Sequence, residues 1–205
     1  MAVAGKTKRD VLLEFRTTEI IDAARRVFAV RGYGGATIDA IAIEAGVAKG
    51  TVYLYFESKR ELFLACLREG VEALHAEVSL QMAAAATCEA KLRAFIGGRF
   101  EYFTRNREFF RIYYTEFSQV IAGTANSQPE FQDLYEEQAR QLEGVLLDGM
   151  AAGELRTVDG RRTARLIYDM VRAGLAHHIL HGTEETPEAA VEDVCAFVWK
   201  GIGGK

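Results

Sequence analysis

The first clear hydrophobic pattern along the chain is that of an amphipathic helix. Apolar side chains recur with the spacing i, i+1, i+4, i+7 and i+8, which places them on one helical face: Ile20, Ile21, Ala24, Val27 and Phe28. Thr17 or Thr18 is a suitable N-cap for this helix, and Arg31 followed by Gly32 is typical of a helix end. We expect a frayed polar lead-in over residues 1–15 before it.

The helical pattern continues along the rest of the chain. Thr37 precedes a short helix that ends at Gly46, and another short helix spans about Lys49–Tyr55. Ser58 and Glu61 form a capping box at the start of a long helix. We expect that helix to reach about residue 84, and later helices near 88–104, 106–122, 128–152, 160–181 and 187–201.

The prolines agree with an all-helical chain. There are only two, Pro129 and Pro187, and each closely follows a capping residue. The first turn of a helix tolerates proline because its missing N–H has no intrahelical partner there. No segment alternates apolar and polar residues as a strand does. The expected fold class is all-α, with about nine helices: a three-helix unit over residues 1–58 and a larger helical domain over residues 59–205.

The two short helices and the turn at Gly46 have the arrangement of a helix-turn-helix motif. Glycine permits the positive φ that the turn needs, while Val47 and Val52 can hold the two helices together. Gly50 lets the backbone approach a sugar-phosphate chain. Four residues are left to point outward with side chains suited to phosphates or base edges: Lys49, Thr51, Tyr53 and Tyr55. Thr37 and Lys59 lie at helix starts, where free N–H groups favour phosphate.

Residues 28–62 resemble the DNA-binding signature of the tetracycline-repressor (TetR) family. That signature contains a phenylalanine, a glycine and a threonine, followed by I-A-x-x-A-G-V-x-x-G-T-x-Y-x-Y-F-x-x-K-x-x-L. The matching residues are Thr37, Ala45, Gly46, Val47, Gly50, Thr51, Tyr53, Tyr55, Phe56, Lys59 and Leu62. One departure is Ala48, where many members have a serine that caps the recognition helix, so that its side chain cannot cap here.

The resemblance implies a homodimeric, ligand-responsive transcriptional repressor that binds a palindromic operator in double-stranded DNA. It implies that Lys49, Gly50, Thr51 and Tyr53 face the major groove, and that Thr37, Tyr55 and Lys59 meet phosphates. It also implies that residues 59–205 bind a small-molecule effector and form the dimer. No cofactor is expected.

The C-terminal region contains many aromatic residues, which can form either a bundle core or a mostly apolar ligand pocket. The resemblance places the inducer pocket among these helices. The candidate pocket residues are Arg99, Tyr102, Phe103, Tyr113, Tyr114, Glu116, Phe117 and His178. In the family, the last two long helices of each subunit form the dimer interface, and the candidates there are Met170, Gly174, Leu175, Val191, Val194 and Val198.

Charge at first argues against a nucleic-acid partner. The chain of 205 residues has a formal net charge of −4, whereas DNA-binding domains are usually basic. Residues 1–60, however, contain 10 Lys+Arg and 7 Asp+Glu, while residues 61–205 contain 15 and 22. The charge is therefore polarised toward a basic N-terminal end, and its modest size favours a few well-placed DNA contacts.

Two observations indicate the compartment. The three cysteines, Cys66, Cys88 and Cys195, are too few and too scattered for a disulfide scaffold, which favours buried thiols in a reducing cytoplasm. The sequence contains no secretory signal and no apolar run of membrane-spanning length. We expect a cytoplasmic protein without a membrane partner.

Two other classes of protein stay open as alternatives. His177, His178 and His181 could belong to a helical metal-binding enzyme, since His177 and His181 share a helix face. A di-iron bundle would need two Glu-x-x-His motifs, and the chain has one, Glu72–His75. No catalytic residues, phosphate loop or nucleophile elbow are recognisable, so we expect no enzyme and no metal site. The other alternative is a dimeric interaction module that does not bind DNA.

Overall fold

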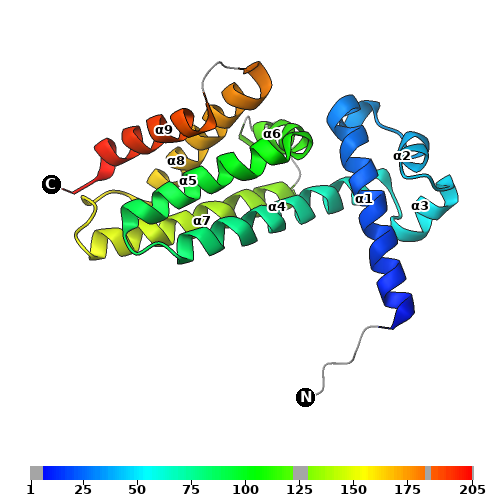
Figure 1. Cartoon of the computed structure of the whole chain (residues 1–205), viewed down its shortest axis with the longest axis horizontal. Coiled ribbons are helices and arrows are strands. Elements are labelled where there is room, and N and C mark those ends of the chain that lie inside the picture. The colour runs from blue at the N-terminus through cyan, green and yellow to red at the C-terminus, as the bar shows by residue number, and fades with distance from the viewer. Residues whose placement is uncertain (1–6, 122–128, 183–185, 205) are drawn as a thin grey trace. The chain divides into compact units, whose positions relative to one another are not determined.

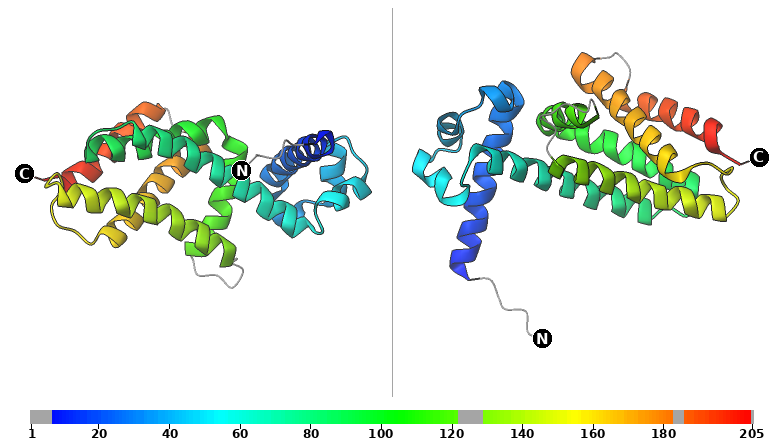
Figure 2. Two further views of the ribbon diagram at one scale, coloured as in Figure 1. Left: turned by 90° about the horizontal axis from the view of Figure 1, so that it is seen from below. Right: turned by 180° about the vertical axis from the view of Figure 1, so that it is seen from behind.

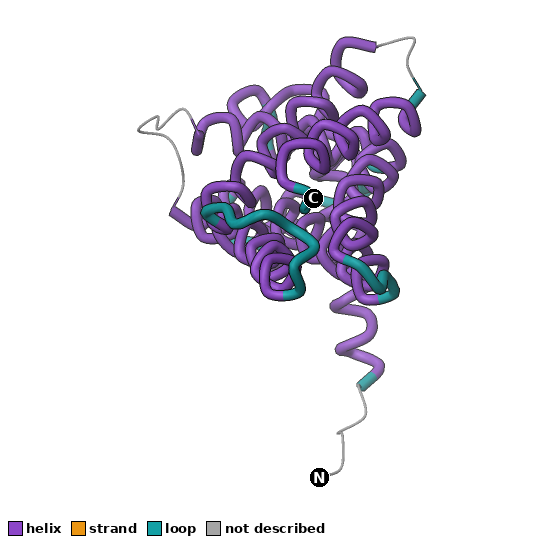
Figure 3. The backbone as a smooth tube through the Cα atoms, turned by 90° about the vertical axis from the view of Figure 1, so that its left-hand side faces the viewer, coloured by secondary structure: helices purple, strands orange, loops and turns teal. Residues whose placement is uncertain are grey.

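The computed structural model describes residues 7–121, 129–182 and 186–204. These residues form helices joined by short loops (Figures 1 and 3), and among them the only β contact is an isolated bridge between Leu155 and Gly203. The helices are α1 (Lys8–Gly35), α2 (Ile38–Glu44), α3 (Lys49–Tyr55), α4 (Lys59–Ala83), α5 (Cys88–Arg105), α6 (Arg107–Ile121), α7 (Pro129–Ala151), α8 (Gly160–Ala176), a π-helical turn (His177–Gly182) and α9 (Pro187–Ile202). The all-helical fold class is confirmed.

The first helix starts earlier than the sequence pattern predicted. It begins at Lys8, so the prediction that Thr17 or Thr18 caps it is wrong. Both hydroxyls instead donate to the carbonyl four residues back, Thr17 to Leu13 at 2.9 Å and Thr18 to Glu14 at 3.1 Å. A hydroxyl bonded in this way is compatible with a continuous helix. The predicted stop near Gly32 does mark a break, because Gly32 has φ 65° and ψ 170°.

Several predicted helix starts are confirmed by their hydrogen bonds. The Oγ1 atom of Thr37 accepts from the N–H of Ala40 at 3.2 Å. At the capping box, Ser58 Oγ accepts from the N–H of Glu61 at 3.1 Å, and the Glu61 carboxylate accepts from the N–H of Glu57 at 2.6 Å. Pro129 and Pro187 are the first residues of α7 and α9.

The chain divides into two compact units at Gly70 and Val71. The first unit reaches beyond the predicted end at residue 58 because the first half of α4 has apolar residues buried with α1. These are Leu62, Phe63, Cys66 and Leu67, and the thiol of Cys66 lies 3.6 Å from the carbonyl oxygen of Ile21. The start of α4 is therefore part of the core of the first unit.

In the second unit, α5 is the central helix. It contacts α6, α7, α8 and α9, and α7 also packs along α8 (Figure 2). The helix predicted over 160–181 is not uniform, since its last turn from His177 is π-helical. Across the described ranges, no helix has the length and apolar character needed to cross a membrane.

Candidate DNA-binding face and effector region

The turn between α2 and α3 is held by backbone hydrogen bonds and a glycine. Gly46 has φ 66°, a left-handed conformation that suits glycine. Its N–H donates to Ile43 at 3.1 Å, and the N–H of Val47 donates to Ala42 at 2.9 Å. The turn predicted at this position is therefore present, and it directs α3 away from α2.

Helix α3 has one buried position and an exposed face opposite to it. Val52 is fully buried, whereas Tyr53 is 48% exposed and Leu54 82% exposed. Lys49 and Gly50 are exposed as well, and Thr51 and Tyr55 are half-buried. A Cβ atom added at Gly50 would meet nothing within 4 Å, so this backbone surface is open. Ala48 makes no side-chain cap, as its residue type predicted.

Lys49 is linked to α2 by an ion pair that the sequence pattern did not reveal. Its Nζ lies 2.8 Å from Oδ2 of Asp39, and both side chains are exposed. The hydrogen bond that Lys49 donates to Asp39, together with the negative charge of Asp39, raises the pKa of the lysine ammonium. Asp39 precedes Lys49 by ten positions on a different helix, so only the turn geometry brings the two together.

Lys59 points back into the first unit. Its Nζ donates to the carbonyl oxygens of Tyr33 at 2.8 Å and Ala36 at 2.9 Å. It also lies 4.5 Å from the centroid of the Tyr33 ring. Thr37, in contrast, is exposed at the start of α2.

Arg99 forms a polar centre inside the second unit. This guanidinium is only 1% exposed, and it donates to the hydroxyls of Tyr113 and Tyr168, each at 2.9 Å. The two hydroxyls also contact each other. Burial raises the pKa of Tyr168 well above its usual value, although the Arg99 cation opposes this effect. The Tyr168 phenol is therefore a neutral hydrogen-bonding group near neutral pH.

Some of the other predicted pocket residues lie near this centre, and others have their contacts with different residues. Phe103 lies under the guanidinium with a ring distance of 5.6 Å, and Tyr102 packs edge-on against Phe103. Tyr114 lies beside Arg172 at 5.6 Å. His178 lies 6.4 Å from the Phe100 ring. The side chains of Glu116 and Phe117 lie outside the described residues.

Tyr168 was missed by the sequence analysis, although a signal was present. It stands on α8 beside Ile167 and three positions before Val171, and all three are buried. A tyrosine on such a face needs a hydrogen-bond partner inside the core. The pattern does not say that this partner is Arg99.

A separate groove of about 790 Å³ lies between α4, α5 and α9. None of the predicted pocket residues lines it. Its centre is formed by small residues of α5, including Ala94, Gly97 and Gly98, with Val191 of α9 opposite. Arg93 and Glu192 form an ion pair with a shortest distance of 2.5 Å at its edge.

The predicted dimer residues divide into core and surface. Leu175 and Val198 are buried within the unit, and their place in a dimer interface stays a prediction. Gly174 packs against the Phe100 ring, Val194 is half-buried, and Met170 is half-buried. The large exposed apolar residues on α8 and α9 are instead Leu166 and Phe197, at 59% and 69% exposure. Apolar spacing identified these helices but not which of their faces points outward.

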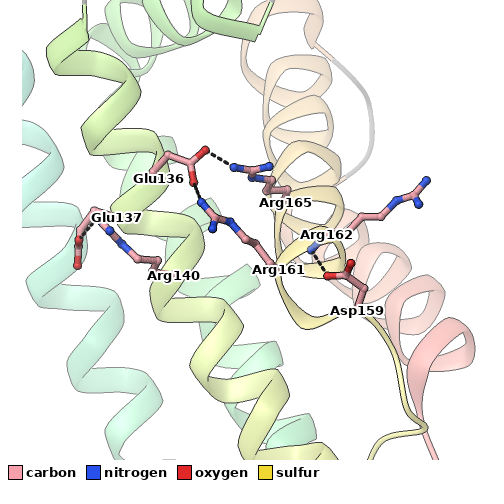
Figure 4. Close-up of polar contacts among 7 residues, drawn as sticks. All are labelled: Glu136, Glu137, Arg140, Asp159, Arg161, Arg162 and Arg165. Carbon is pink, nitrogen blue, oxygen red and sulfur yellow. Dashed lines mark hydrogen bonds and ion pairs between the residues drawn. The ribbon is translucent and has the colours of Figure 1, made fainter.

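An arginine-rich cluster joins α7 to the start of α8 (Figure 4). The carboxylate of Glu136 accepts from Arg161 at 2.9 Å and also from Arg165. Asp159 caps α8 by accepting from the N–H of Arg162 at 2.9 Å. Burial acts to raise the pKa of Glu136, but the two arginines outweigh it and lower the pKa. These arginines thus fix the packing of two helices of the bundle.

The rings of two of the candidate metal-binding histidines lie near each other, but the described residues around them do not complete a metal site. The rings of His177 and His181 lie 6.0 Å apart. In the part of the chain that the structure describes, no three His, Cys, Asp or Glu residues are grouped as a metal site requires. The described thiols are buried and free, with no disulfide between them.

Two family models match this chain. Residues 20–66 match the model of bacterial regulatory proteins of the tetR family, and residues 85–174 match that of the tetracyclin repressor-like C-terminal domain. The chain therefore belongs to the tetR family and is a DNA-binding transcriptional regulator. The family consists of regulators rather than enzymes, in agreement with the expectation that the chain is not an enzyme.

Among individual proteins, the chain is similar to transcriptional regulators of several bacteria. It is 24% identical to the fatty acid metabolism regulator protein of Bacillus subtilis, over 91% of this chain and 95% of the relative. The crystal structure of the regulator FadR from Bacillus subtilis in complex with stearoyl-CoA matches with a TM-score of 0.82 and 23% identity, over 90% of this chain and 98% of that one. The ketosteroid regulator KstR2 of Mycobacterium tuberculosis matches with a TM-score of 0.73 and 25% identity, over the full length of both chains.

Proposed function

We propose that the protein is a cytoplasmic, homodimeric repressor that leaves a palindromic operator when it binds a small-molecule effector. The observation that carries the DNA-binding part of this proposal is the geometry of α3. One buried residue, Val52, fixes the helix, and Lys49, Gly50 and Tyr53 are exposed on the rest of its surface. An exposed lysine and tyrosine beside an open glycine backbone suit contacts with phosphates and base edges.

Helices α8 and α9 carry the residues that support a two-fold dimer. Leu166 and Phe197 are large apolar side chains exposed on neighbouring helices of the same unit, with the half-buried Met170 on α8. Large apolar side chains exposed on neighbouring helices are candidates for an interface. A closed dimer uses the same patch on both subunits, and it presents two copies of α3 to successive major grooves.

For the effector we propose a long-chain fatty acyl-CoA thioester. The support is the similarity to the fatty acid metabolism regulator and to FadR in complex with stearoyl-CoA. We place the polar end of the effector site at Arg99, whose guanidinium is held in the bundle by Tyr113 and Tyr168. A carbonyl or anionic oxygen could accept from this guanidinium in place of a tyrosine hydroxyl. The effector acts only through its different affinities for the two states of the protein.

A titration of the full-length protein onto DNA from upstream of its own gene tests this proposal. We expect salt-dependent binding with a preference for a palindrome, and release of the DNA by stearoyl-CoA but not by free CoA. Binding without sequence preference at every salt concentration would contradict the repressor. Specific binding that stearoyl-CoA leaves unchanged would contradict only the effector class.

A further inference from the structure

The ammonium of Lys59 is engaged on three sides within the first unit. It donates to the carbonyl oxygens of Tyr33 and Ala36, at 2.8 and 2.9 Å, and it lies over the Tyr33 ring. That ring in turn packs against Phe63, with 4.8 Å between the centroids. Since an ammonium has three N–H donors, these two carbonyls already use two of them.

Both acceptors lie where the chain needs an external donor. Gly32 interrupts α1, and the following residues form a last turn closed by the bond from the N–H of Ala36 to the carbonyl of Gly32, at 3.1 Å. Carbonyl groups at the end of a helix have no N–H of the same helix to accept from. Lys59 supplies that donor from the first residue of α4.

The segment that Lys59 contacts leads directly into the helix-turn-helix. Ala36 is followed by Thr37, the N-cap of α2. Helix α2 buries only Ile38, Ile41 and Ala42, and α3 buries only Val52. With so few buried side chains, the direction of these short helices depends strongly on how the chain enters α2.

We propose that Lys59 is a positioning residue, which acts on DNA binding through the α1–α2 junction and not through a phosphate. The resemblance to the family implied a phosphate contact for this lysine. The two roles differ in a measurable way. A phosphate contact releases counterions, so its loss lowers the salt dependence of binding, whereas the loss of a positioning contact lowers affinity equally at every salt concentration.

The test compares the operator affinity of full-length Lys59→Met and Lys59→Arg with that of the wild type from 50 to 300 mM salt. Methionine keeps an unbranched apolar side chain and removes the donors, while arginine retains them. We expect Lys59→Met to bind about tenfold more weakly with an unchanged salt slope, as for the loss of two hydrogen bonds. Lys59→Arg should recover most of the affinity. Arg60→Met removes a charge from the neighbouring exposed position and should change affinity less than about threefold.

Unchanged affinity in Lys59→Met, or a salt slope reduced by about one unit for each subunit, would overturn the proposal. A measurement on the wild type needs neither a variant nor a known operator. The Lys59 ammonium should exchange its protons with water more slowly than that of the exposed Lys200, as followed by ¹⁵N NMR, and should keep its chemical shift when DNA is added. Equal exchange rates, or a shift on addition of DNA, would also overturn it.

Discussion

Lys49 on α3 and Asp39 on α2 form an ion pair across the helix-turn-helix, with 2.8 Å between Nζ and Oδ2. Both side chains are exposed, so the pair adds little to stability. Its importance lies in which charge reaches DNA: the lysine attracts phosphates and the aspartate repels them. Each partner can be removed without disturbing the core.

We predict opposite effects for the two halves of this pair. Lys49→Met should weaken operator binding about tenfold and reduce the salt slope, because a cation near the phosphates is lost. Asp39→Asn should strengthen binding severalfold, because it releases the lysine and removes a negative charge. Fluorescence anisotropy with labelled operator at several salt concentrations measures both. If Asp39→Asn binds more weakly, the aspartate orients Lys49 and does not compete with DNA.

Two glycines of α7 should respond to alanine in opposite directions. A Cβ atom at Gly149 would lie 2.5 Å from Sγ and 2.9 Å from Cβ of Cys88, whereas at Gly144 it would meet nothing within 4 Å. We expect Gly149→Ala to lower the free energy of unfolding by about 1–3 kcal/mol through overpacking. Gly144→Ala should raise it by about 0.5–1 kcal/mol, since alanine favours the helix. Urea unfolding of both variants decides the matter, and equal effects would contradict the close packing at Gly149.

Arg99 should matter more for the effector response than for folding. An apolar side chain of similar length at this position removes the cost of burying a charge, and the Tyr113 and Tyr168 hydroxyls can still bond to each other. We expect Arg99→Met to retain operator binding and to lose release by stearoyl-CoA. Tyr168→Phe, which leaves the guanidinium in place, should lose less of the response. A fully responsive Arg99→Met would exclude this arginine from the effector site.

Stability should fall in alkaline solution because of Cys66. Burial raises the pKa of this thiol from 9.0 to about 12. Between these two values the unfolded chain releases the proton and the folded protein retains it. The free energy of unfolding therefore decreases by up to about 1.4 kcal/mol for each pH unit above 9. Urea unfolding under reducing conditions from pH 8 to 10.5 should show a shallower decline in Cys66→Ala. Parallel curves for the two proteins would contradict the buried, protonated thiol.

The exposed apolar residues of α8 and α9 should control the oligomeric state. We expect Leu166→Glu and Phe197→Glu each to shift the protein toward monomer, because they place a charge in an apolar interface. Leu80→Glu on α4 is a matched control, since Leu80 is 74% exposed and lies on another helix. Sedimentation velocity distinguishes the states. A monomeric wild type, or dimers in all three variants, would refute this interface.

Local patterns in the sequence determined much of the molecule. The apolar spacing and caps such as Thr37 and Ser58 predicted the helices, because capping and helical periodicity depend only on neighbouring residues. The signature around Gly46 was enough to identify the helix-turn-helix and the family. Local patterns predicted the start of the first helix wrongly, because Thr17 and Thr18 are possible N-caps that lie inside a continuous helix.

The tertiary structure alone decided which residues far apart in sequence meet. It brought Tyr168 to Arg99, linked Asp39 to Lys49, and directed Lys59 inward to Tyr33 and Ala36. It also buried Leu175 and Val198 while leaving Leu166 and Phe197 exposed. A helix carries its apolar pattern in its own sequence, but the side of that pattern that faces the core depends on the neighbours against which the helix packs.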